Sequence, residues 1–261
     1  MIYEIFAQTD QGLVRKNNED ALAFDPKTGL CLLADGMGGY NAGEVASSMA
    51  VAFLSQALTA WLSQAGNRAS GRDLRRTMEA CVNQVNQSIF SAACSNPDQA
   101  GMGTTLVAGV FIESRLMLGH IGDSRCYRLR GGVLQQITRD HSLLQEQVDA
   151  GLMTAEQALT SPHRNLITRA LGVEDAVLVE INEHRVEPAD LYLMCSDGLS
   201  DMVLDPVIEA LLNAPGTLRQ KAAALIRVAN DSGGRDNITV LLVQAAEDES
   251  RRGLLSRMLG K

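Results

Sequence analysis

Residues 30–36 read LCLLADG, an apolar run of strand length that ends in an aspartate and a glycine. The same pattern returns at residues 116–124, LMLGHIGDS, and at residues 191–198, LYLMCSDG. Apolar runs bounded by Asp and Gly are typical of buried β-strands that end in a turn. A lone Asp-Gly usually marks only a turn. Three such strands predict that several carboxylates meet at one edge of a packed sheet.

The order of the expected elements indicates the fold class. Strands are expected at Ile2–Thr9, Leu30–Ala34, Thr104–Ile112, Arg115–Ile121, Cys126–Arg130, Val133–Thr138, Val177–Glu183, Leu191–Cys195 and Ile238–Val243, and long helices at Gly43–Ser63 and Arg72–Ala93. Many strands follow one another directly, as in antiparallel hairpins. We therefore expect an α+β fold of mostly antiparallel sheets rather than a regular β-α-β winding. Residues 1–245 are expected to form one domain and residues 246–261 a C-terminal tail.

Composition limits the class of partner. The chain has 261 residues, 46% of them hydrophobic and 21% charged, with a net charge of −8. These values predict a globular protein that binds neither nucleic acid nor a membrane surface and is better suited to holding cations. The five cysteines include no CxxC pair. An odd number of cysteines in apolar surroundings predicts reduced thiols and a cytoplasmic location.

The acidic residues predict a site for hard divalent cations. Asp35, Asp123 and Asp197 end the three apolar strands, and Asp236 directly precedes a fourth apolar run. Carboxylates brought close together are costly without a counter-cation, and their oxygens favour Mg²⁺ or Mn²⁺. Two such ions suit in-line displacement at phosphorus, and they lower the pKa of a bridging water to about 7, which gives hydroxide at neutral pH. Arg15, on the loop after the first strand, has the guanidinium fork that matches phosphate oxygens.

Other hydrolytic and phosphate-binding signatures are absent from the sequence. No cysteine has an arginine six positions later, as a cysteine-dependent phosphatase requires. The sequence also has no GxxxxGK[ST], HExxH, GxSxG or EF-hand pattern. The four histidines do not pair at zinc-ligand spacing with one another or with cysteine. Metal-assisted hydrolysis is therefore the leading class of reaction.

Six short motifs resemble those of one enzyme family. They are VRKNNED at 14–20, ADGMGG at 34–39 followed by GEVAS at 43–47, GTT at 103–105, GDSR at 122–125, SDGL at 196–199 and GGRDNIT at 233–239. Each is weak alone, but together they follow the order and spacing of the metal-dependent protein phosphatases, the PPM or type 2C family. The resemblance covers about residues 5–244 and is nearest to the bacterial cytosolic branch.

The resemblance implies a four-layer α-β-β-α sandwich that hydrolyses phosphoserine and phosphothreonine in proteins through a metal-bridging hydroxide. Its substrates would be phosphorylated proteins, and a Ser/Thr protein kinase would oppose it. Two alternatives stay open: a non-catalytic regulatory module on the same fold, or a phosphatase acting on a non-peptide substrate. The presence of Asp35, Asp197 and Asp236 disfavours the regulatory module, because degenerate relatives usually lose these residues.

The resemblance also implies roles for individual residues. Asp35 would bridge two Mg²⁺ or Mn²⁺ ions, the Gly36 carbonyl would join one ion, Asp197 and Asp236 would hold the other, and Asp123 would help to hold a third. Arg15 would bind the phosphate, Glu19 and Asp20 would orient water, Asn237 would support the site, and Thr160 would lie on a substrate-facing flap.

One position departs from the animal branch of the family. Those members carry a histidine directly after the Asp-Gly, as a proposed general acid, whereas this chain has Met37. A thioether cannot protonate the leaving alkoxide, so we expect a metal-bound water to do so. None of the four histidines has a claim to this role from a motif.

Overall fold

The strands form two antiparallel sheets, and the computed structural model describes residues 1–39, 42–66, 70–154, 157, 161 and 166–247. The first sheet has the order β1 (Ile2–Asp10), β11 (Ile238–Ala246), β10 (Leu191–Cys195), β7 (Arg125–Arg130) and β8 (Val133–Gln136). The second has the order β2 (Asp20–Asp25), β3 (Leu30–Met37), β5 (Leu106–Ile112), β6 (Arg115–Ile121) and β9 (Glu180–Arg185), with β4 (Gly103–Thr104) paired to the end of β3. Every one of these pairings is antiparallel.

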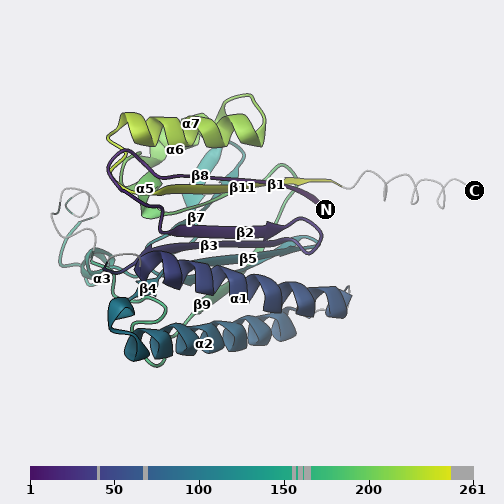
Figure 1. Ribbon diagram of the computed structural model, residues 1–261. Coiled ribbons are helices and arrows are strands. Elements are labelled where there is room, and N and C mark those ends of the chain that lie inside the picture. The colour runs from purple at the N-terminus through teal and green to yellow at the C-terminus, as the bar shows by residue number, and fades with distance from the viewer. Residues whose placement is uncertain (40–41, 67–69, 155–156, 158–160, 162–165, 248–261) are drawn as a thin grey trace, which may run out of the picture.

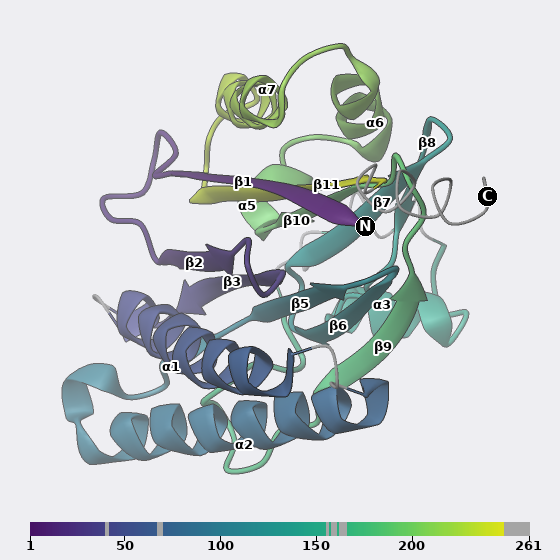
Figure 2. The ribbon, with the colours of Figure 1, turned by 90° about the vertical axis from the view of Figure 1, so that its right-hand side faces the viewer.

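Helices cover the outer face of each sheet (Figures 1 and 2). The long helices α1 (Ala42–Ala65) and α2 (Gly71–Ser95) lie on the second sheet, and α6 (Asp205–Asn213) and α7 (Leu218–Asp231) lie on the first. The shorter elements are α3 (Leu143–Asp149), α5 (Asp197–Ser200) and the 3₁₀ turn η2 (Pro97–Gln99). The four-layer α-β-β-α sandwich implied by the resemblance is confirmed.

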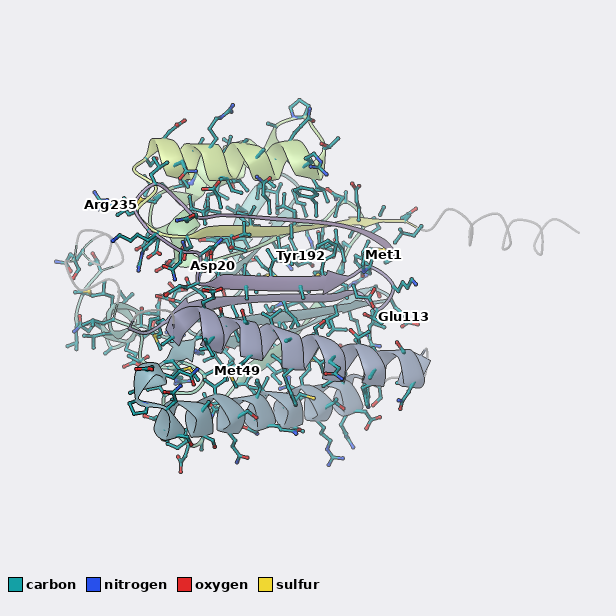
Figure 3. All side chains as sticks on the ribbon, viewed as in Figure 1. Met1, Asp20, Met49, Glu113, Tyr192 and Arg235 are labelled. Atoms are coloured by element: carbon teal, nitrogen blue, oxygen red, sulfur yellow. The ribbon has the colours of Figure 1, made fainter. Side chains whose placement is uncertain are left out.

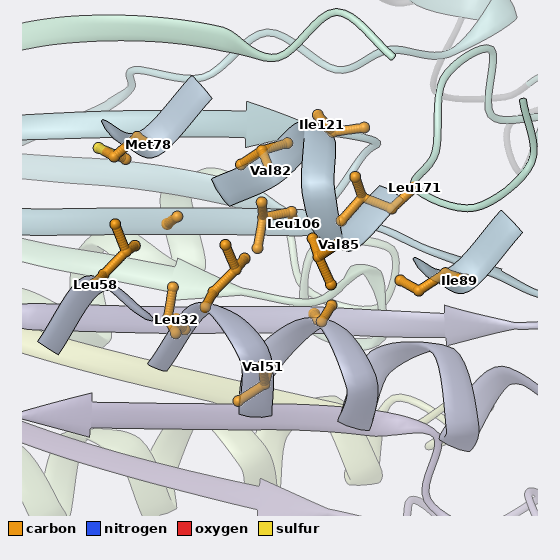
Figure 4. Close-up of a cluster of buried hydrophobic side chains, with 14 of the residues drawn as sticks. Leu32, Val51, Leu58, Met78, Val82, Val85, Ile89, Leu106, Ile121 and Leu171 are labelled. Carbon is orange, nitrogen blue, oxygen red and sulfur yellow. The ribbon is translucent and has the colours of Figure 1, made fainter. Parts of the chain in front are cut away.

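Three apolar layers hold the sandwich together. On β3, Leu30 and Leu32 face α1 and α2, whereas Cys31 and Leu33 face the other sheet, as strand alternation requires. Figure 4 shows the layer on the helix side, where Leu32 lies among side chains of both long helices. By length and composition α1 is apolar enough to cross a membrane, and part of its surface is buried against the second sheet in this layer.

The observed elements differ from the expected ones at a few places. Strand β2 was not expected, because its sequence DALAFD is short and carries an acid at each end. The expected strand at 104–112 is interrupted at Thr105, which lies between β4 and β5. The expected strand at 177–183 forms at 180–185 instead. Most of the expected tail lies outside the described residues.

Candidate active site

The site lies where the layer between the two sheets changes from apolar to polar. Cys31 and Leu33 of β3 point into this layer, and alternation places Asp35 on the same side. On β11, Leu241 lines the layer, and Thr239 continues its row toward the same end. Figure 3 shows Asp20 and Arg235 at this end and Met1 and Glu113 at the opposite end. On both sheets, the residues that point into this layer are apolar along most of the strand and polar at this end.

Asp20 and Asp35 lie opposite each other in the ladder between β2 and β3. The Oδ2 atom of Asp20 accepts hydrogen bonds from Ser196 Oγ at 2.8 Å and Thr239 Oγ1 at 2.6 Å, so the first sheet holds this carboxylate of the second. Burial raises the pKa of Asp20 to about 6. Burial, with the nearby charges of Asp20 and other aspartates, raises the pKa of Asp35 well above its usual range.

Asp197 and Asp236 come from the first sheet. Asp197 follows β10 at the start of α5, and burial together with the charges of Asp123 and Asp236 raises its pKa well above the usual range. Asp236 precedes β11, and its Oδ2 atom accepts a hydrogen bond from Arg15 Nη2 at 2.6 Å. The Arg15 side chain is 50% exposed. Its guanidinium is thus positioned at the site and remains accessible from solvent.

Asp123 lies in the turn between β6 and β7. Burial, followed by the charge of Asp140, raises the pKa of Asp123 to about 7. Arg125 lowers this pKa, but its Nε and Nη2 atoms already bind Asp140 at 2.7–3.1 Å. Asp123 therefore has little cationic compensation of its own.

Asn237 fastens the loop between β1 and β2. Its Oδ1 atom accepts the Glu19 N–H at 2.7 Å, and its Nδ2 atom donates to the carbonyls of Gln11 at 3.0 Å and Asn17 at 2.9 Å. The Glu19 carboxylate accepts a hydrogen bond from Asn17 Nδ2 at 3.1 Å. These bonds tie together the loop that carries Arg15.

Gly36 brings β3 and α1 into direct backbone contact. A Cβ atom at this position would lie 2.1 Å from the Gly43 carbonyl oxygen, which no side chain tolerates. The Gly36 N–H donates to the Glu19 carbonyl at 3.1 Å. A glycine is required here because the backbone itself fills the space.

The donor set fits hard divalent cations. Asp20, Asp123 and Asp197 each have a buried Oδ1 atom without a hydrogen-bond partner. Within the described ranges, no three His, Cys, Asp or Glu side chains already converge as ligands of one ion. Mg²⁺ usually keeps several waters, so a few protein oxygens per ion are enough. A cation would also relieve the mutual repulsion that raises these pKa values.

Comparison with known proteins identifies the family. The sequence profile of the family described as Protein phosphatase 2C matches residues 14–242. The chain is 40% identical over 240 residues to the serine/threonine phosphatase stp of Listeria innocua, covering 91% of this chain and 94% of that protein. This chain belongs to the protein phosphatase 2C family. It is a serine/threonine protein phosphatase, and its substrates are phosphoproteins.

Solved structures agree with this 2C-type assignment. The crystal structure of the serine/threonine phosphatase PstP/Ppp of Mycobacterium tuberculosis is 41% identical in sequence and matches with a TM-score of 0.86, over 95% of this chain and 100% of that one. A structure of the PstP catalytic domain in complex with two manganese ions is 40% identical, with a TM-score of 0.82, over 94% of this chain and 99% of that one.

Two histidines of this 2C phosphatase lie behind the Asp123 turn. The rings of His120 and His141 are 4.9 Å apart, and burial lowers the pKa of His141 and lowers that of His120 to about 4. His141 Nδ1 accepts the Gly122 N–H at 3.1 Å, and His120 Nε2 lies 2.8 Å from the Ser124 carbonyl oxygen. Both imidazoles therefore bind the backbone of the turn as neutral rings.

Two further positions complete the comparison with the sequence. Thr160 lies outside the described residues. Sequence reasoning missed Asp201, whose charge raises the pKa values of both Asp123 and Asp197. Asp201 follows Asp197 by four residues at the end of α5. The i, i+4 spacing on a helix was the available signal, because it places two side chains on one face.

Proposed function

We propose that this phosphatase works with two Mg²⁺ or Mn²⁺ ions held by Asp35, the Gly36 carbonyl, Asp197 and Asp236, with a third ion near Asp123. The observation that carries the proposal is that Asp35, Asp123 and Asp197 have raised pKa values, and that Asp123 and Asp197 also have a buried Oδ1 atom without a hydrogen-bond partner. When bound, such a pair of ions makes a water nucleophilic at neutral pH and stabilises charge on the phosphoryl oxygens.

The chain's own residues bind and orient the substrate and water. Arg15 presents a half-exposed guanidinium beside Asp236, where it can bind two phosphoryl oxygens. Asp20 is held by Ser196 and Thr239 through one oxygen, which leaves its Oδ1 atom to orient a water. Asp20 therefore acts as a fixed acceptor.

The leaving alkoxide takes its proton from water in the site. Met37 occupies the position of the general acid in animal relatives and has no proton to donate. The neutral imidazoles of His120 and His141 are engaged behind the Asp123 turn. We propose water in the site as the proton donor in place of these side chains.

We further propose that the enzyme acts in the cytoplasm against a Ser/Thr protein kinase. The five cysteines are all free thiols, the state that a reducing compartment maintains. A phosphoprotein phosphatase also requires a kinase that supplies its substrate. Phosphorylated proteins of that compartment are the proposed substrates.

The test is hydrolysis of a phosphothreonine peptide with and without Mn²⁺. We expect activity that requires the metal and falls by more than about 100-fold in Asp197→Asn, beyond the range for residues that only support a ligand. Glu113→Gln, an exposed change at the opposite end of the molecule, is the matched control. A wild type inactive with both Mn²⁺ and Mg²⁺ contradicts the mechanism. Full activity in Asp197→Asn contradicts the ligand assignment.

A further inference from the structure

Thr105 binds both backbone polar groups of Asp35. Its N–H donates to the Asp35 carbonyl at 2.9 Å, and its Oγ1 atom accepts the Asp35 N–H at 2.9 Å. Thr105 is 1% exposed, so water cannot readily replace these bonds. They fix the stretch of main chain from which the Asp35 carboxylate projects.

The same side chain also reaches the turn that carries Asp123. The Thr105 hydroxyl lies 2.7 Å from Ser124 Oγ, and the hydrogen bond between them can run in either direction. A Cβ atom on Gly122 would lie 2.6 Å from Thr105 Cγ2, so the backbone of Gly122 packs directly on the threonine methyl group. Both neighbours of Asp123 in the chain therefore touch Thr105.

The backbone of this turn also has two hydrogen bonds that do not involve Thr105. His141 accepts the Gly122 N–H, and His120 donates to the Ser124 carbonyl. The turn is thus clamped between two imidazoles and one threonine. Thr105 differs from the two imidazoles because it also binds the backbone of Asp35.

We propose that Thr105 is a positioning residue that couples Asp35 to Asp123. Its hydroxyl sets the distance between the carboxylate of Asp35 on β3 and that of Asp123 in the β6–β7 turn, and so tunes how the site binds divalent ions. The inference rests on the metal-binding roles proposed above. It predicts that a substitution in the turn that carries Asp123 changes the hydrogen bonding of the Asp35 backbone.

Four substitutions separate this role from a general loss of packing. Thr105→Val keeps the shape and the methyl group but removes the hydroxyl, whereas Thr105→Ser keeps the hydroxyl. The control is Thr138→Val, because Thr138 Oγ1 accepts the Cys126 N–H at 2.9 Å, the same kind of bond at the same length on another strand. Ser124→Ala breaks only the link to the Asp123 turn and carries the test if Thr105→Val does not fold.

The first readout is amide hydrogen exchange at Asp35 in the metal-free protein. Thr105→Val should speed this exchange by about tenfold or more, since it removes the partly buried hydrogen bond that the Asp35 N–H donates. Thr105→Ser should restore slow exchange, and Thr138→Val should leave it unchanged. Ser124→Ala should also speed it, although Ser124 does not contact Asp35. Unchanged exchange at Asp35 in Ser124→Ala would overturn the coupling.

The second readout is calorimetric titration with Mn²⁺. Thr105→Val and Ser124→Ala should bind Mn²⁺ about fivefold to tenfold more weakly than Thr138→Val. The Ser124→Ala effect should disappear when Asp123 is already replaced by alanine. If it persists unchanged there, Ser124 does not act through Asp123 and the inference is wrong. If the wild type binds no Mn²⁺, the proposed metal site fails instead, which is a different outcome.

Discussion

At the scale of single residues, the site gathers several carboxylates with few cationic side chains to compensate their charge. Burial raises the pKa of Asp20 to about 6 and that of Asp123 to about 7. A raised pKa means that the folded, metal-free protein binds more protons than the unfolded chain between the two pKa values. The contribution of such a group to stability is therefore lost as the pH rises through that window. For Asp123 the window runs from its ordinary value of 3.8 to about 7.

Asp123→Asn should flatten the pH dependence of stability in the metal-free protein. Between about pH 5 and 8, the free energy of unfolding of the wild type should fall more than that of the variant, by up to about 3 kcal/mol. Urea unfolding with a chelator at several pH values measures the difference. Glu113→Gln, an exposed change, serves as the control. Equal pH slopes for wild type and Asp123→Asn would show that Asp123 ionises normally.

At the scale of elements, the loop between β1 and β2 is held in place by residues distant in the sequence. The Leu13 N–H donates to the Gly234 carbonyl at 2.8 Å. Gly12 has φ +77°, and a Cβ atom there would lie 2.2 Å from the Asp236 carbonyl oxygen. Asn237 adds three further hydrogen bonds. The loop thus carries Arg15 on a fixed base next to Asp236.

Asn237→Ala should therefore weaken both stability and catalysis. The variant leaves the buried Glu19 N–H and two partly buried carbonyls without these partners, which should cost about 2–3 kcal/mol of stability. We also expect kcat/KM for a phosphopeptide to fall by about tenfold or more at saturating Mn²⁺, as for other residues that support a site. Thermal unfolding and steady-state kinetics measure the two effects. Asn213→Ala removes two exposed hydrogen bonds of a side-chain amide and should change neither stability nor kcat/KM. If Asn237→Ala is stable and keeps the wild-type kcat/KM, the loop does not contribute to the mechanism.

At the scale of the whole molecule, the layer between the sheets has an apolar body and a charged end. The apolar part, which includes Leu33, Tyr192 and Val243, stabilises the sandwich. The aspartates at the polar end repel one another and oppose that stabilisation. Anything that neutralises their charge should therefore stabilise the entire fold.

Mn²⁺ should raise the melting temperature of the wild type. At a concentration 100 times the dissociation constant, binding adds about 2.7 kcal/mol, or about 5–10 °C for a domain of this size. Asp35→Asn should melt no lower than the metal-free wild type, because it removes a buried charge, yet it should respond little to Mn²⁺. Calorimetric scans with metal and with a chelator distinguish these cases. If the melting temperature of the wild type does not change at saturating Mn²⁺, the proposed metal site is contradicted.

Much of the fold and of the ligand set could be predicted from the sequence, because both depend on patterns within a few neighbouring residues. Apolar runs at Leu191–Cys195 and Arg115–Ile121 coincide with β10 and β6, since a strand's pattern is read over a few neighbouring residues. The same local reading singled out the aspartates at the strand ends. It failed for β2, whose identity as a strand depends on pairing with β3.

Only the tertiary structure decided which of these residues face one another. Asp20 lies opposite Asp35 because β2 pairs in that register, and Arg15 reaches Asp236 across 221 positions of the chain. The contact of Thr105 with Ser124 likewise depends on β5 and β6 lying side by side. The sequence by itself determined most of the strands, the fold class and the acidic residues. Pairing register and the packing of one sheet on the other decided the geometry, because these arise from contacts between segments far apart in the chain.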